Sequence, residues 1–230
     1  GDYSGWSVSI DSDGSHVAIG AQDNDGTGSS SGHVRIFTWD GSAWTQVGSD
    51  IDGEAASDWS GNSVSIDSDG SHVAIGAREN DGNGSSSGHV RIYEYSSGSW
   101  TQVGNDIDGE AASDRSGYSV SIDSDGSHVA IGAYGNDGNG SDSGHVRIYE
   151  YSSGLWTQVG NDIDGEAAYD SSGYSVSIDS DGSHVAIGAH GNDGGGSDSG
   201  HVRIYEYSSG SWTQVGNDID GEAASDRSGI

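Results

Sequence analysis

The chain has 230 residues and a formal net charge of −30, with 37 Asp and Glu residues against 7 Arg and no Lys, and it contains no Cys. This charge repels phosphate groups, which argues against binding to nucleic acids or to anionic membranes. Without Cys there are no disulfides and no Cys-ligated zinc, and no apolar run is long enough for membrane insertion.

The sequence starts with a pattern of short strands. Residues 7–11 read SVSID and alternate polar with apolar side chains, as in a half-buried strand, and Asp13-Gly14 predicts the tight turn of a hairpin. After a loop rich in Asn, Asp, Gly and Ser the alternation returns. The next strands are predicted at residues 15–21, 33–39 and 43–47, and no helix is predicted.

The same short segment occurs four times in the sequence. The segment SIDSDGSHVAIGA at residues 9–21 recurs three more times, always 56 residues further on. A fixed period of this length is typical of stacked copies of one supersecondary unit. We therefore expect a single array over residues 1–230. Its units are predicted at approximately 6–61, 62–117, 118–173 and 174–229.

The apolar side chains of one unit occupy both faces of its predicted sheet. On the third strand, Val34 and Ile36 lie on one side, while Phe37 and Trp39 lie near the other. Burying each such side chain contributes about 1.5–3 kcal/mol, but ordering each residue costs about 1.5 kcal/mol. A unit is therefore unstable alone and must pack face to face with its neighbours. This predicts an all-β fold, a β-propeller of four-stranded antiparallel blades.

The repeat resembles the FG-GAP type found in integrin α-subunit propellers and in secreted microbial and algal proteins. The resemblance covers all four units and is clearest in DGSHVAIGA at 125–133, GHVRIY at 144–149 and WTQVG at 156–160. It implies a four-stranded blade and an extracellular adhesive or binding role without catalysis. The calcium loop of many integrin-type blades is not expected here, because Ser9 and His16 stand near its outer acidic positions.

Acidic residues recur between the fourth strand of one unit and the first strand of the next. Their D-x-D-x-E-x-x-x-D spacing imitates the first oxygen ligands of a calcium-binding loop but lacks its bidentate Glu. We predict either calcium as a cofactor of these segments or, alternatively, solvated turns. The candidate ligands are Asp50, Asp52, Glu54, Asp58, Asp106, Asp108, Glu110, Asp114, Asp162, Asp164, Glu166, Asp170, Asp218, Asp220, Glu222 and Asp226.

Other polar residues recur with the repeat. His16 and His33 and their copies lie on predicted strands without a nearby second His, which favours satisfied packing over metal binding. The mid-strand Arg35 and its copies are expected to pair with carboxylates. Asn83 and Asn139 begin Asn-Gly-Ser sequons and are candidate glycosylation sites in an exposed loop.

Catalysis is not expected, because no nucleophile, base and acid set occurs once rather than four times. We predict a secreted or cell-surface structural or adhesive protein whose partners are copies of itself, other surface proteins or glycans. The alternative is a lectin-like propeller with pockets between blades. Such pockets are expected at the position occupied by Gln22, Arg78, Tyr134 and His190, although its residue differs in every copy.

The first and last six residues match the same part of the repeat, so we expect a segment of a longer surface or filament protein. Every predicted blade is complete, and no blade is built from both chain ends. Three arrangements follow: a closed ring of four blades, a ring of eight blades from two chains, or a continuing array.

Overall fold

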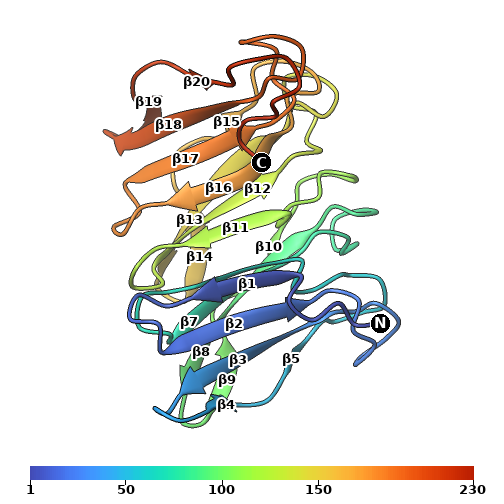
Figure 1. Cartoon of the computed structure of the whole chain (residues 1–230), viewed down its shortest axis with the longest axis vertical. Coiled ribbons are helices and arrows are strands. Elements are labelled where there is room, and N and C mark those ends of the chain that lie inside the picture. Colours follow the sequence, from blue (N-terminus) through green and yellow to red (C-terminus); the bar gives the residue numbers. More distant parts are fainter.

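The computed structural model describes all residues from Gly1 to Ile230 and contains only β-strands, in four separate sheets. Figure 1 shows the first sheet, in blue, in the lower part of the molecule and the last sheet, in red with β20, at the top. The predicted all-β architecture of repeated antiparallel blades is confirmed. No helix exists that is long and apolar enough to cross a membrane.

All four blades have the strand order of the first blade. Its strands are β1 (Ser7–Ile10), β2 (His16–Ala21), β3 (His33–Trp39), β4 (Trp44–Gln46) and β5 (Ile51–Asp52). The remaining strands are β6 (Ser63–Ile66), β7 (His72–Ala77), β8 (His89–Ser96), β9 (Ser99–Gln102), β10 (Ile107–Asp108), β11 (Ser119–Ile122), β12 (His128–Ala133), β13 (His145–Ser152), β14 (Leu155–Gln158), β15 (Ile163–Asp164), β16 (Ser172–Ile178), β17 (His184–Ala189), β18 (His201–Ser208), β19 (Ser211–Gln214) and β20 (Ile219–Asp220).

Each blade has a fifth, two-residue strand that the sequence pattern did not predict. Strands β1 to β4 pair in chain order, and β5 pairs with the start of β3, where Val34 faces Ile51. The outer edge of the blade is therefore split between β4 and β5. Part of the segment predicted as an inter-blade loop is thus ordered by main-chain hydrogen bonds, and Ile51 packs into the core between the first and second blades.

The blades pack face to face, as the two-sided apolar pattern predicts. Ala18, Val34 and Ile36 on the back of the first blade form one cluster with the front of the second, including Ile66 and Val73. Equivalent clusters join the second blade to the third and the third to the fourth. The hydrophobic core of the protein therefore lies between sheets rather than inside any one of them.

Hydrogen bonds tie each blade to the next across this core. Ser63 Oγ donates to Gly117 O over 2.7 Å, and Trp156 Nε1 donates to Val103 O over 2.8 Å. At the same boundary a Cβ added to Gly76 would lie 2.0 Å from Gly117 O. This position is glycine because the neighbouring main chain occupies the space of a side chain.

The two ends of the stack are uncovered. Ile10 on the front of the first blade is 60% exposed, whereas its copies Ile66 and Ile122 are 6% and 7% exposed. On the back of the last blade Ile219 is 55% exposed, against 4% for its copy Ile107. Figure 1 shows the first and last blades at opposite ends of the molecule. The four blades form an open arc and do not close into a ring of four.

Candidate functional sites at the blade boundaries

The first recurring histidine of each blade is satisfied by hydrogen bonding, as predicted. His72 Nδ1 and His128 Nδ1 each lie 2.8 Å from a carboxylate oxygen, of Asp67 and Asp123 respectively. These bonds raise the pKa of both histidines, and the His128 bond helps to hold the pKa of Asp123 below its usual value against the opposing effect of burial. These histidines fix the turn between the first two strands of the blade.

The second recurring histidine is buried without such a partner, and for His145 and His201 the prediction of satisfied packing is wrong. His145 and His201 are each 1% exposed; Nε2 of His145 and both ring nitrogens of His201 have no hydrogen-bond partner. Burial lowers the pKa of His145 to about 4 and that of His89 to about 4, so these imidazoles are neutral at pH 7. Each sits at the start of the third strand, beside the boundary to the preceding blade.

Carboxylates from two blades surround each of these three histidines. His145 Nδ1 lies 3.9 Å from Glu110 Oε2 of the preceding blade and 3.8 Å from Asp162 Oδ2 of its own blade. The three ligand atoms all lie within 4.8 Å of one another. The same grouping occurs for Glu54, His89 and Asp106, and for Glu166, His201 and Asp218. The first blade has no preceding Glu and brings together His33, Asp50 and Asp52 instead.

The acidic residues of one inter-blade segment are thus shared among different sites. The third of them, Glu54, joins the next blade, while the fourth, Asp58, is buried and accepts hydrogen bonds from Ala55 N and Asn80 Nδ2. Asp114 and Asp170 repeat this arrangement.

Burial raises the pKa of Asp108 and of Asp164, which lie in the short fifth strands. In the last segment Asp220 follows Ile219 in β20, Glu222 and Asp226 are exposed, and Asp226 accepts from Ala223 N. Calcium binding by these segments stays a prediction.

Three of the four mid-strand arginines pair with carboxylates of the preceding blade, as predicted; for Arg35 the prediction is wrong, because the first blade has no preceding Glu here and Arg35 donates to Ser4 Oγ instead. Arg91 Nη1 lies 3.3 Å from Glu54 Oε1, and Arg91 Nη2 donates to Asp52 O. Arg147 and Arg203 make the equivalent contacts with Glu110 and Glu166. Each guanidinium therefore fixes the Glu that also faces a buried histidine.

Residues that differ between the repeats come together in one continuous strip on the side of the long loops. We call this the variable strip; its residues are Trp59, Arg78, Arg115, Tyr118, Tyr134, Tyr174 and His190. The Arg78 guanidinium lies 4.7 Å from the Trp59 ring and 5.1 Å from the Tyr118 ring. The Tyr118 ring is 4.7 Å from Tyr174, which is 4.2 Å from His190.

The sequence identified only part of the variable strip. The position of Arg78, Tyr134 and His190 stands out because it differs in each unit, but Trp59 and Tyr118 belong to two other positions of the repeat. Aligning the four units and selecting the positions at which they differ would have identified all residues of the variable strip. The predicted pocket position in the first blade, Gln22, is buried and takes no part in these aromatic contacts.

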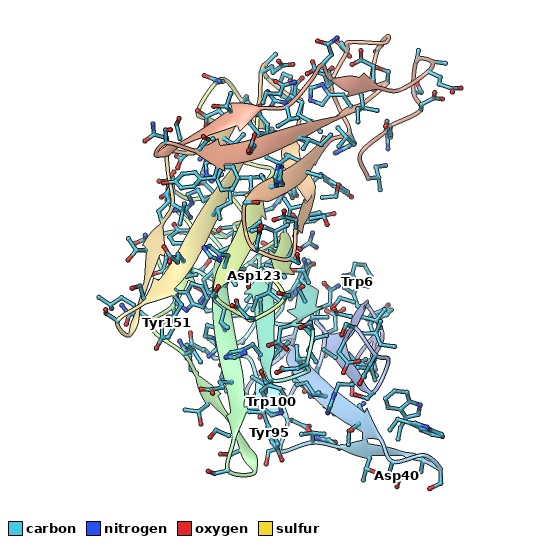
Figure 2. The ribbon with its side chains drawn as sticks, turned by 90° about the vertical axis from the view of Figure 1, so that its left-hand side faces the viewer. Trp6, Asp40, Tyr95, Trp100, Asp123 and Tyr151 are labelled. Carbon is cyan, nitrogen blue, oxygen red and sulfur yellow. The ribbon has the colours of Figure 1, made fainter.

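Shallow polar hollows also recur at the outer edge of the blade boundaries. One of about 340 Å³ is lined by Asp50, Tyr93 and Trp100, and one of about 240 Å³ by their copies Asp162, Tyr205 and Trp212. Figure 2 shows Tyr95 and Trp100 side by side near this edge, with their rings 5.2 Å apart.

The candidate glycosylation residues lie in the long loop, as predicted. Asn83 Nδ2 donates to Gly109 O over 3.0 Å, and Asn139 Nδ2 donates to Gly165 O over 2.8 Å. A glycan attached to either nitrogen would compete with this hydrogen bond. Glycosylation stays a prediction.

Two solved structures are similar in fold to this chain. One is the crystal structure of a putative 6-phosphogluconolactonase from Bacteroides uniformis, with a TM-score of 0.59 and 11% identity over 93% of this chain and 54% of that chain. The other is a periplasmic gluconolactonase from Pseudomonas aeruginosa, with a TM-score of 0.58 and 15% identity over 93% of this chain and 56% of that chain. The chain thus spans about half the length of these structures, and at such identities the likeness shows the fold alone.

The sequence itself matches a known repeat. A search with the whole sequence of this chain found no matching curated protein. The FG-GAP repeat matches residues 49–93, 106–149 and 162–205, which together make up more than half of the chain. Each match runs from the end of one blade into the third strand of the next and so includes the buried histidine and its boundary. The chain therefore belongs to the FG-GAP repeat family.

Proposed function

We propose that this protein is a non-catalytic, extracellular structural or adhesive repeat protein whose blades stack on the blades of further copies. Membership of the FG-GAP repeat family supports an extracellular adhesive role, since such repeats are typical of surface and secreted proteins. The recurrence of every polar cluster at successive boundaries supports a structural rather than a catalytic use of these residues.

The observation that carries the proposal is the uncovered front of the first blade. Val8 and Ile10 are 65% and 60% exposed there, and with Val17, Phe37 and Trp44 they form an apolar surface. The copies of these residues in later blades are covered by the back of the preceding blade. The back of the last blade presents Val202, Ile204 and Ile219, the copies of the residues that do the covering. The front of the first blade and the back of the fourth are therefore complementary surfaces of the kind that join head to tail.

Light scattering at increasing protein concentration tests the proposal. We expect the mean mass to rise above that of one chain and expect Ile10→Asp to abolish the rise. Leu155→Asp is the matched control, because Leu155 is 51% exposed but lies at the outer edge of an internal blade. A monomer at every concentration, or equal effects of the two variants, would contradict stacking.

A second candidate function, ligand binding, is favoured by the variable strip. The repeat keeps its core constant and changes at positions that converge in space, as expected when a scaffold presents one composite surface. Half-buried Tyr and Trp rings offer apolar faces to sugar rings, and Arg78 and Arg115 offer hydrogen-bond donors.

A glycan array tests this second function. We expect a repeatable glycan signal that Tyr118→Ala removes and that Tyr151→Ala, at the outer edge of the same blade, leaves unchanged. The absence of any signal, or its loss in both variants, would contradict a binding role of the strip.

A further inference from the structure

The three buried histidines at the blade boundaries are unusual because their surroundings suit a cation better than a hydrogen bond. Each Nδ1 is 3.8–4.0 Å from two carboxylate oxygens, beyond the range of about 2.7–3.2 Å for a hydrogen bond. His201 has no partner for either ring nitrogen although it is 1% exposed. A buried, unpaired imidazole between two carboxylates is costly as it stands.

We propose that a zinc ion, or a similar first-row transition metal, binds at each of these three boundaries. In the middle one the ligands are Glu110 Oε2 from one blade and His145 Nδ1 and Asp162 Oδ2 from the next. Glu54 with His89 and Asp106, and Glu166 with His201 and Asp218, form the other two sites.

The spacing of the ligand atoms fits such an ion after a small closure. Zinc lies about 2.0–2.2 Å from imidazole nitrogen and carboxylate oxygen, which places tetrahedral ligand atoms about 3.4 Å apart. The observed Nδ1 to oxygen separations of 3.8 and 3.9 Å at the middle site exceed this by about 0.5 Å. Glu110 and Asp162 have side chains that are 45% and 32% exposed, so the ion can reach the site and keep a water as its fourth ligand.

The carboxylates are held in place by contacts that leave one oxygen free. Asp162 Oδ1 accepts a hydrogen bond of 2.6 Å from Gln158 Nε2, and Glu110 Oε1 lies 3.6 Å from Arg147 Nη1. The other oxygen of each carboxylate faces the histidine. Partners of this kind orient metal ligands in protein sites.

The ligand set distinguishes this site from the calcium site predicted from the sequence. Calcium takes oxygen ligands only, whereas one imidazole with two carboxylates is a set that suits zinc. The predicted calcium ligands came from one segment, but the structure combines residues of two successive segments with a histidine. Each bound ion would therefore join two neighbouring blades.

Isothermal titration of the metal-free chain with Zn²⁺ tests the proposal. We expect His145→Gln to bind one equivalent fewer than the wild-type protein, and His128→Gln, whose histidine belongs to the other set, to bind as many as the wild-type protein. Glu110→Gln, at a half-exposed position, provides a second variant that should also bind one equivalent fewer if His145→Gln does not fold. Co²⁺ titration followed by visible absorption should give the same stoichiometries together with bands of a four-coordinate ion.

Three results would overturn the inference. One is no saturable binding of Zn²⁺ to the wild-type chain. Another is an unchanged stoichiometry in both His145→Gln and Glu110→Gln. The third is displacement of Zn²⁺ by an equal concentration of Ca²⁺, which would assign the carboxylates to calcium as the sequence predicts.

Discussion

Two isoleucines with the same sequence surroundings give a direct test of where the stability of the array resides. Ile10 and Ile122 both lie in the segment SIDSDGSHVAIGA, but Ile122 is 7% exposed against the second blade and Ile10 is 60% exposed at the uncovered end. Replacement by Ala removes three carbon atoms, worth about 2.4 kcal/mol when fully buried. Ile122→Ala should lose nearly all of this burial free energy and also leave a cavity. The free energy of unfolding should therefore fall by about 2–5 kcal/mol in total.

The same replacement at Ile10 should cost about 1 kcal/mol or less, because Ile10 is more than half exposed and no cavity forms. Urea unfolding at low protein concentration, followed by tryptophan fluorescence and by circular dichroism, measures both free energies of unfolding. If Ile10→Ala destabilises the protein as much as Ile122→Ala in a monomeric sample, then the front of the first blade is covered within one chain, and the open arc is refuted.

The remaining predictions concern single contacts. Trp156→Phe should lower the free energy of unfolding by about 0.5–1.5 kcal/mol more than Trp44→Phe, because the Trp156 indole donates to the preceding blade and the Trp44 indole has no such bond; equal urea midpoints would contradict this. Gly132→Ala should prevent normal docking of the fourth blade, since its Cβ would lie 2.0 Å from a main-chain oxygen, and a wild-type melting temperature would contradict the packing. The pKa of His128 is raised by Asp123, so their pair stabilises the fold fully below the unfolded pKa of His, near 6.5, and loses this effect as the pH rises through the folded pKa. The pKa of Asp123 is lowered, so the effect is also lost as the pH falls through that folded value. The difference in stability between the wild-type protein and His128→Gln should therefore be largest in mildly acidic solution, and a difference that grows toward alkaline pH would exclude the pair.

The repeat and the alternation within it were enough to predict the blades. SVSI and HVAIGA alternate over a length that only a strand explains, and Asp13-Gly14 fixes their turn, so β1 and β2 lie within one residue of their predicted bounds. β5 was missed because Ile51 and Asp52 are too short a segment to show any period. Its pairing depends on β3 extending past β4, which no local pattern reveals.

The candidate sites were harder to predict because they cross blade boundaries. Glu54 meets His89 only because the back of one blade is offset against the front of the next. Spacing along one segment therefore grouped Glu54 with Asp50 and Asp58, while the structure groups it with residues of the following repeat. Burial of the histidine follows from the same docking and is equally invisible in the local sequence.

The hydrogen bonds that join the blades connect residues of neighbouring repeats, such as Ser63 with Gly117 and Trp156 with Val103. No such bond reaches beyond the neighbouring blade, so the boundaries carry a pulling force at the chain ends in series, and each boundary can open separately. A blade that gives way releases 56 residues, which extend by about 190 Å, while the blades behind it stay folded. The arc would then lengthen in discrete steps under load and dissipate energy at each step, a mechanical behaviour that would suit the adhesive role proposed above.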